Sequence, residues 1–247
     1  MPPFPKSALL QRLRTQIANL APAGHGKLAL DGADVDGALG GGLAIGGLHA
    51  LQGAGIEEET SAVPAAFLAT LLGRLACELP VFWISASCDL YAPGLIGHGL
   101  DPARLIQLRC DNDCEALGCM ETLLRSAVPA AVVTEISRVS GLAGRRLQMA
   151  CLGTGVTGFL VRRWPHGRRD ADAITAAVTR WRLSPAPSLR DGRMPGRPRW
   201  HVELLHTHAG PPAEWILEHE DSHDATYPFR VVAGMADTPA AARRLAG

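Results

Sequence analysis

Arginine is the residue type in this sequence most able to bind a ligand. Residues 138 to 200 contain 13 arginines and 3 acidic residues, a net charge of +10, so the rest of this electrically neutral chain carries −10. A guanidinium group binds phosphate through paired hydrogen bonds and stacks on nucleic-acid bases. Such a basic region is typical of a nucleic-acid surface or of a docking surface for an acidic partner. Because the chain has 22 arginines beside 2 lysines, genomic base composition is an alternative origin.

Cysteine and histidine are weaker candidates for chemistry. Three cysteines in residues 110 to 119 follow the spacing C-x₃-C-x₄-C, without the second ligand pair that a zinc site requires. We expect free thiols there. On a regular strand His206 and His208 share one face and His201 lies on the opposite face, so at most two of them converge. The sequence contains no G-x-S-x-G motif, and we expect no metal site and no hydrolase nucleophile.

Alternating strands and helices are predicted for the first two thirds of the chain. Strands are expected at 48–51, 80–86, 104–109, 130–136 and 156–163, and helices at 61–77, 113–127 and 142–152. Asp113 is a plausible N-cap for the second helix. This alternation favours a mostly parallel sheet covered by helices on both faces. Residues 176–183, 199–207 and 214–219 alternate apolar and polar side chains without helices between them, which predicts antiparallel strands that extend the sheet.

An amphipathic helix is predicted before this sheet, over residues 9 to 20. Its apolar side chains follow spacings of 3, 4 and 3 and form one narrow stripe: Leu10, Leu13, Ile17 and Leu20. The stripe packs either on the protein's own core or on another molecule. We therefore divide the chain into an N-terminal helix and linker (1–25), a core (26–236) and a C-terminal tail (237–247).

The sequence lacks the features of a membrane protein. Its longest apolar runs fall well short of the ~20 residues that cross a bilayer. The N-terminus has no unbroken apolar centre of the kind that secretory signals carry. The 6 cysteines are unevenly spaced and do not indicate a disulfide framework. We expect a cytoplasmic protein with reduced thiols.

Four segments in a fixed order carry a family resemblance. Residues 34–60 (DVDGALGGGLAIGGLHALQGAGIEEET), 91–110, 140–163 and 179–188 resemble the ImuA family, the RecA-like accessory proteins of bacterial translesion DNA synthesis. The resemblance extends from about residue 9 to about residue 218. It implies that residues 26–236 form a RecA-like α/β core, a mostly parallel twisted sheet flanked by helices, with antiparallel C-terminal strands.

The segment that corresponds to a phosphate-binding loop is altered. A working loop follows G-x-x-x-x-G-K-[ST], in which backbone N–H groups and the lysine hold the phosphates. Here Gly53 and Thr60 are retained, but Glu58 replaces the second glycine and Glu59 replaces the lysine. A unit charge pair at ~4 Å is worth ~1 kcal/mol in water and ~4 kcal/mol at an effective dielectric near 20, so a repulsive carboxylate is costly. We predict a degenerate site that binds no nucleotide and needs no cofactor.

The resemblance also places two residues on the strands beside this loop. Ser87 stands where a RecA-like enzyme would have its water-activating glutamate, and a serine is no carboxylate base. Glu135 stands where a Mg²⁺-associated aspartate would be. The sequence thus predicts a protein that is not an enzyme. The alternative is an ATP-dependent DNA-binding protein whose loop turns residues 57–59 away from the nucleotide.

Eight arginines are the candidates for binding DNA or a partner: Arg145, Arg146, Arg162, Arg163, Arg168, Arg169, Arg180 and Arg182. In RecA-like proteins the connection after the strand at 156–163 lies near the DNA axis, so the resemblance places Arg168 and Arg169 at phosphate contacts. Arg180 and Arg182 share a strand face, with Trp181 on the opposite face and expected in the core. A solvated surface is the alternative for all eight.

The resemblance implies a function in DNA damage tolerance and SOS mutagenesis. The chain would be a non-catalytic adaptor that scaffolds ImuB and an error-prone DNA polymerase. RecA and single-stranded DNA are further candidate partners, and a modulator of RecA filaments is an alternative function. RecA-like cores also form rings and filaments, so we expect a homo-oligomer, with the stripe at residues 10–20 as a candidate contact.

Overall fold

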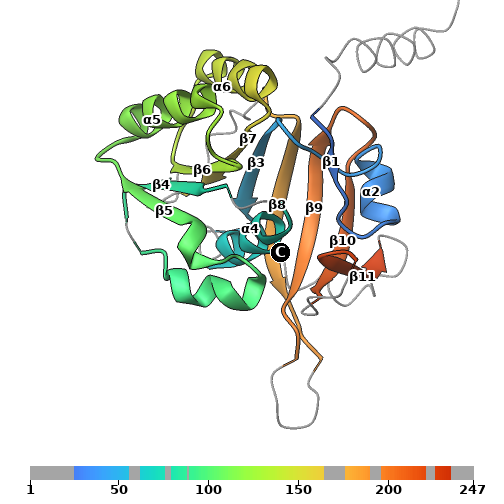
Figure 1. The fold of residues 1–247 in the computed structure, drawn as a ribbon. Coiled ribbons are helices and arrows are strands. Elements are labelled where there is room, and N and C mark those ends of the chain that lie inside the picture. The colour runs from blue at the N-terminus through green and yellow to red at the C-terminus, as the bar shows by residue number, and fades with distance from the viewer. Residues whose placement is uncertain are drawn as a thin grey trace, which may run out of the picture.

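A computed structural model describes residues 25–55, 62–75, 79–87, 89–163, 176–189, 196–220 and 226–234. In these residues a nine-stranded sheet has the order β11-β10-β9-β8-β3-β7-β6-β4-β5 (Figure 1). Its strands are β3 (Leu48–Gly53), β4 (Val81–Ser85), β5 (Leu105–Arg109), β6 (Ala131–Ile136), β7 (Thr157–Arg162), β8 (Thr179–Ala186), β9 (Arg199–Thr207), β10 (Ala213–His219) and β11 (Phe229–Gly234). The helices are α2 (Asp34–Ala38), α4 (Val63–Arg74), α5 (Asp113–Ser126) and α6 (Gly141–Thr154), with 3₁₀ turns η1 (Ala92–His98) and η2 (Pro102–Arg104).

The sheet has a parallel part and an antiparallel part. Strands β5, β4, β6, β7, β3 and β8 run parallel, whereas β9, β10 and β11 continue the sheet in antiparallel pairs. All residues of β6 and β7 are buried, which explains why both strands are mostly apolar and do not alternate apolar and polar side chains. The predicted fold class, a RecA-like α/β core with antiparallel C-terminal strands, is confirmed.

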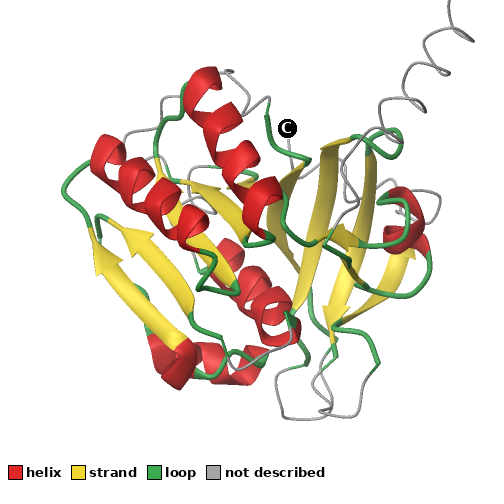
Figure 2. Cartoon of the chain, turned by 45° about the horizontal axis from the view of Figure 1, so that its top comes forward, coloured by secondary structure: helices red, strands yellow, loops and turns green. Residues whose placement is uncertain are grey.

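Two hydrophobic cores lie on the two faces of the sheet. On one face α4 packs through Phe67 against Trp181, Trp200 and Phe229, and the Phe67 and Phe229 rings stack with centroids 4.9 Å apart. The other core contains Leu147 of α6, together with side chains of α5 and of β3, β6 and β7. The longer helices therefore gather over the parallel strands, as Figure 2 shows.

The start of α5 differs from the prediction. Asn112, not Asp113, is the N-cap, and its side-chain oxygen accepts a hydrogen bond of 3.0 Å from the backbone N–H of Glu115. The carboxylate of Asp113 instead accepts hydrogen bonds from the hydroxyl of Ser137 at 2.6 Å and the backbone N–H of Arg138 at 2.8 Å. The predicted cap was wrong because Asp113 is used to tie the end of β6 to α5.

A β-bulge changes the face on which one histidine lies. Arg180 is paired with His206 but Trp181 with Leu204, so β9 contains one extra residue at this point. The shift places His206 on the same sheet face as His201, and the prediction of opposite faces was wrong. Strict alternation along a strand holds only where no extra residue interrupts the pairing.

Several short elements were not predicted. The ribbon β1 (Lys27–Leu28) and β2 (Leu43–Ala44) precedes the main sheet, and α2 lies between its strands. Gly42 allows this ribbon, because its φ is +120° and an added Cβ would lie 2.6 Å from the Leu28 carbonyl oxygen. Residues 1–24 and 235–247 lie outside the described part, which leaves the stripe at 10–20 and the domain limits untested. No described helix has the length and apolarity needed to cross a membrane.

Candidate functional site

The carboxyl ends of the central parallel strands are where open α/β sheets bind their ligands. Of the residues predicted for a degenerate nucleotide site, the structure describes Gly53 at the end of β3, Ser87 just after β4 and Glu135 in β6. The other three, Glu58, Glu59 and Thr60, lie outside the described residues. The site can therefore be analysed from the strands that surround the loop.

Gly53 remains part of the sheet up to the start of the loop. It is buried and lies opposite Leu183 of β8, and the backbone N–H of Ala54 donates a hydrogen bond of 2.9 Å to the Leu183 carbonyl. On the far side of the loop, α4 begins after Ala62, which makes no side-chain capping bond. The ends of β3 and α4 thus fix the two points that the loop connects.

Glu135 is a buried carboxylate held by residues from both neighbouring strands. The indole N–H of Trp83 on β4 donates a hydrogen bond of 2.8 Å to Glu135 Oε1. Arg163, which directly follows β7, places its Nη1 at 3.0 Å from Oε2, an ion-pair contact without hydrogen-bond geometry. Only 8% of Glu135 is exposed, so this carboxylate depends on these two contacts for its stabilisation.

Arg163 joins Glu135 to a second carboxylate. Its Nη1 lies 2.9 Å from Asp89 Oδ1 and 3.0 Å from the hydroxyl oxygen of Ser87. The Ser87 hydroxyl in turn donates a hydrogen bond of 2.9 Å to Asp89. We call these five residues, Trp83, Ser87, Asp89, Glu135 and Arg163, the Arg163 cluster. Its members lie on β4, β6 and β7 or within a few residues after these strands, which are adjacent in the sheet.

The two carboxyl groups of the Arg163 cluster differ in acidity. Burial raises the pKa of Glu135, although the charge of Arg163 and the hydrogen bond from Trp83 act in the opposite direction. Burial would also raise the pKa of Asp89, but hydrogen bonds from Ser87 and Arg163 outweigh it and lower that pKa. Asp89 is therefore a weak base, and Glu135 is the group for which ionisation is costly.

The polar groups of the Arg163 cluster bind one another, so they are already occupied without a ligand. Arg163 faces the carboxylate that the sequence assigned to a Mg²⁺ position, and the Ser87 hydroxyl is bonded to Asp89. From the sequence, Arg163 was predicted to bind DNA or a partner, Asp89 was examined only as part of a nucleophile motif and rejected, and Trp83 was given no role in a site. A usable signal existed, because an arginine at the end of one parallel strand lies beside a carboxylate at the end of the next.

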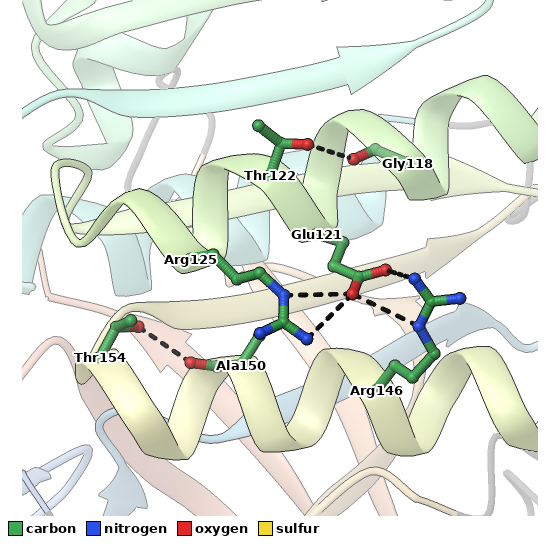
Figure 3. A network of polar contacts seen from close by, with 7 residues as sticks. All are labelled: Gly118, Glu121, Thr122, Arg125, Arg146, Ala150 and Thr154. Atoms are coloured by element: carbon green, nitrogen blue, oxygen red, sulfur yellow. Dashed lines mark hydrogen bonds and ion pairs between the residues drawn. The ribbon is translucent and has the colours of Figure 1, made fainter.

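The remaining candidate arginines occupy two further places. Arg145 and Arg146 lie exposed on α6, and Arg146 forms an ion pair of 2.5 Å with Glu121 of α5. Figure 3 shows Glu121 between Arg146 and Arg125, which also contacts it at 3.0 Å. These two candidates therefore lie on a helix, whereas the other described candidates lie on strands or directly after one.

Arg162 and Arg182 share one face of the sheet. Gln52 of β3 is paired with Arg162 of β7 on one side and with Arg182 of β8 on the other, so the two arginines flank it. Arg180 also lies on this face, and Trp181 is buried on the opposite face, as predicted. Arg168 and Arg169 lie outside the described residues. Binding of DNA or a partner by these arginines stays a prediction.

The described cysteines are free thiols. Cys110 and Cys119 place their sulfur atoms 3.8 Å apart, and Cys114 is exposed. Burial raises the pKa of the Cys110 thiol to about 11 and that of Cys151 to about 12. These thiols are therefore weak nucleophiles at neutral pH. Within the described ranges, no group of three or more histidine, cysteine or acidic side chains is arranged to hold a metal ion.

The strand order and its antiparallel extension define this protein as a RecA-like α/β protein with an ion-pair cluster at the carboxyl ends of its parallel strands. No family model matches the chain. Protein ImuA of Caulobacter vibrioides (strain NA1000 / CB15N) is 41% identical over 221 residues, which cover 84% of this chain and 89% of that protein. Protein ImuA of a second strain of the same species, CB 15, matches to the same extent. The chain belongs to the ImuA family.

Proposed function

We propose that this protein is a non-catalytic RecA-like adaptor of a translesion DNA synthesis complex. It would scaffold ImuB and an error-prone DNA polymerase during the SOS response. Membership of the ImuA family supports a role in this system. The adaptor role requires a rigid core and docking surfaces but no covalent chemistry.

The Arg163 cluster is the observation that carries this proposal. In a nucleotide-hydrolysing enzyme the carboxylate at this position needs to be available to the metal and its water ligands. Here Glu135 lies 3.0 Å from Arg163 and accepts a hydrogen bond from Trp83. A nucleotide would have to separate these charges inside a largely buried site. That separation leaves a buried carboxylate without its partner, which is expensive.

The loop sequence adds a second reason. Glu58 and Glu59 stand at the glycine and lysine positions of the phosphate-binding pattern, so two carboxylates replace groups that would face the phosphates. The alternative, an ATP-dependent DNA-binding protein, needs these side chains turned away and the Arg163 cluster opened. No observation on the described residues favours it.

Assembly with ImuB tests the proposal. The purified full chain and ImuB are mixed with and without Mg²⁺-ATP and separated by size-exclusion chromatography. We expect co-elution to the same extent in both conditions, because an adaptor needs no nucleotide. A complex that forms only with Mg²⁺-ATP would support the ATP-dependent alternative, and no complex in either condition would contradict the adaptor function.

Direct DNA binding is tested separately. Fluorescence anisotropy of a labelled single-stranded oligonucleotide over a salt series measures how many phosphates are neutralised, since the logarithmic slope is roughly −0.7 per phosphate. Binding through Arg162 and Arg182 predicts a smaller slope for Arg182→Ala. Because Arg182 forms an ion pair of 3.0 Å with Glu203, we expect Glu203→Gln to strengthen binding. A slope unchanged in both variants would assign these arginines to the fold alone.

A further inference from the structure

The outward face of α6 carries large apolar side chains that are exposed to solvent. Leu142 is 71% exposed and Met149 is 65% exposed. Their spacing of seven residues puts them on one side of the helix, with Arg145 between them. The opposite side of α6 is buried through Leu147 and Cys151. We call Leu142, Arg145 and Met149 the α6 stripe.

Positive charge borders the α6 stripe. Arg145 is exposed and makes no hydrogen bond or ion pair with the residues that the structure describes. Next to it, Arg146 and Arg125 share the single carboxylate of Glu121, and both arginine side chains remain 60% exposed (Figure 3). Three guanidinium groups and one carboxylate leave this surface with a net charge of +2. Apolar side chains bordered by unneutralised arginines suit a ligand that is both apolar and acidic.

The helices that present the α6 stripe are fixed to each other. The ion pair between Arg146 and Glu121 joins α6 to α5 near the middle of both helices. At the end of α6 the hydroxyl of Thr154 lies 2.8 Å from the Leu124 carbonyl of α5 and 3.0 Å from the Ala150 carbonyl. The platform is therefore ordered before any partner binds, which lowers the entropy cost of docking.

The described part of the chain begins beside α6, but the residues that precede it in the sequence do not match the charge of the α6 stripe. His25 enters the described part beside the end of α6, where its Nε2 is 3.0 Å from the Leu152 carbonyl. Residues 1–24 contain Lys6, Arg12 and Arg14 and no acidic residue. This segment would bring like charges to Arg145. Nucleic acid is also a poor match, because a phosphate backbone gains nothing from Leu142 and Met149.

We propose that the α6 stripe docks an acidic amphipathic helix of a partner protein. Apolar side chains at helical spacing would pack on Leu142 and Met149, and flanking carboxylates would face Arg145 and Arg146. The proposal deepens the adaptor function and rests on it, since it names the surface and the chemistry through which one partner is held.

Three synthetic peptides with a fluorescent label test the chemistry. The first repeats leucine at helical spacing (i, i+3, i+4, i+7) with glutamate elsewhere; the second has lysine for glutamate, and the third has serine for leucine. Anisotropy with the full chain should show saturable binding of the first peptide alone. Equal binding of the lysine peptide, or no binding of the first up to about 1 mM, would overturn the proposal.

Variants of the full chain locate the site. We expect Arg145→Glu and the double variant Leu142→Ser with Met149→Ser each to weaken binding of the leucine and glutamate peptide by about tenfold or more. Two substitutions at other surface positions serve as matched controls. Arg109→Glu reverses an exposed charge on β5, and Ile96→Ser replaces an apolar residue of η1 that is 60% exposed. Both controls should bind as the wild type does. Loss of binding in the controls, or retention in the stripe variants, would overturn the proposal.

The same variants separate this proposal from the adaptor function. If ImuB co-elutes with the wild type and equally with the stripe variants, the adaptor function stands and the α6 stripe is not its docking surface. If ImuB fails to bind the wild type, the adaptor function itself fails. Light scattering supplies a further check, because a stripe variant that dissociates a wild-type oligomer would assign the surface to self-association and overturn the proposal.

Discussion

The two halves of the sheet use charged residues in opposite ways. At the carboxyl ends of the parallel strands, charges converge on one point, where Arg163 contacts both Glu135 and Asp89. Where the strands pair in antiparallel fashion, from β8 to β11, most described ion pairs join neighbouring strands, as with Arg182 of β8 and Glu203 of β9 at 3.0 Å. His201 and Glu214 form the corresponding contact between β9 and β10 at 3.3 Å.

The difference lies in burial and in the number of partners. Glu135 is almost fully buried and has one cation, so removing that cation leaves a charge without compensation. Arg182 and Glu203 have side chains that are 38% and 25% exposed, so water can replace either partner. The buried charges of Glu135 and Arg163 therefore determine which ligands their site can bind. The exposed pair of Arg182 and Glu203 contributes little to stability beyond aligning β8 with β9.

Removal of Arg163 should have the largest effect. We expect Arg163→Met to lower the free energy of unfolding by about 3 kcal/mol, because Glu135 stays buried without its cation. Urea unfolding measures this loss. Adding Glu135→Gln to Arg163→Met should recover a substantial part of it, since the uncompensated charge is then gone. A loss below about 1 kcal/mol would show that the Arg163 cluster is no more important than an exposed pair.

Glu218 differs from the exposed ion pairs of the antiparallel strands, because it is a buried carboxylate. It is buried, with Arg199 at 2.5 Å and Arg230 as a second cation. We expect Glu218→Gln to cost about 2 kcal/mol in urea unfolding, less than Arg163→Met because Arg230 remains largely exposed. The matched control is Glu220→Gln, which removes an ion pair with exposed arginines and should cost about 0.5 kcal/mol. Equal losses for both would contradict the role of burial.

The pH dependence of stability should have opposite signs for Glu135 and Glu218. The folded pKa of Glu135 is raised above its ordinary value of 4.5, so its contribution is present below that pH and lost as pH rises through the folded pKa. The folded pKa of Glu218 is lowered, although burial alone would raise it, because Arg230 and Arg199 outweigh burial. Its contribution is present above pH 4.5 and lost as pH falls through the folded pKa.

Urea unfolding from acid to neutral pH measures these signs. As pH rises, the wild type should lose stability relative to Glu135→Gln and gain stability relative to Glu218→Gln. If the stability difference from the wild type changed with pH in the same direction for both variants, the prediction of opposite signs would be wrong.

The exposed pair between β8 and β9 should have the smallest effect. We expect Arg182→Ala to change the free energy of unfolding by about 0.5 kcal/mol, and less in high salt. Thermal unfolding of this variant, of Glu203→Ala and of the double variant gives the coupling between them. A coupling above about 1.5 kcal/mol would place this pair with the buried ones.

Much of the fold follows from hydrophobic patterning. The runs at residues 130–136 and 156–163 predicted the buried strands β6 and β7, and the alternation at 199–207 gave the limits of β9. The bulge that moves His206 and the two-residue strands of the ribbon were missed. Such features depend on pairing with a distant strand or on single glycines, which leave no periodic pattern in the sequence.

The site was predicted only in part. The sequence placed Ser87 and Glu135 at the nucleotide position, and the structure brings these two residues together through Arg163 and Asp89. The role of Arg163 was missed because the net charge was summed over a continuous stretch of sequence, which does not show which residues are neighbours in space. Which arginine faces which carboxylate depends on strand order, and here β7 lies next to β6.

The central claim is that the Arg163 cluster and the altered loop leave no nucleotide site. Isothermal titration calorimetry of Mg²⁺-ATP into the full chain tests it most directly. We predict no saturable binding at millimolar nucleotide, both for the wild type and for Asp89→Asn, which removes a carboxylate of the cluster. Saturable, Mg²⁺-dependent binding of one nucleotide per chain would contradict the account and would assign the protein to the ATP-dependent class.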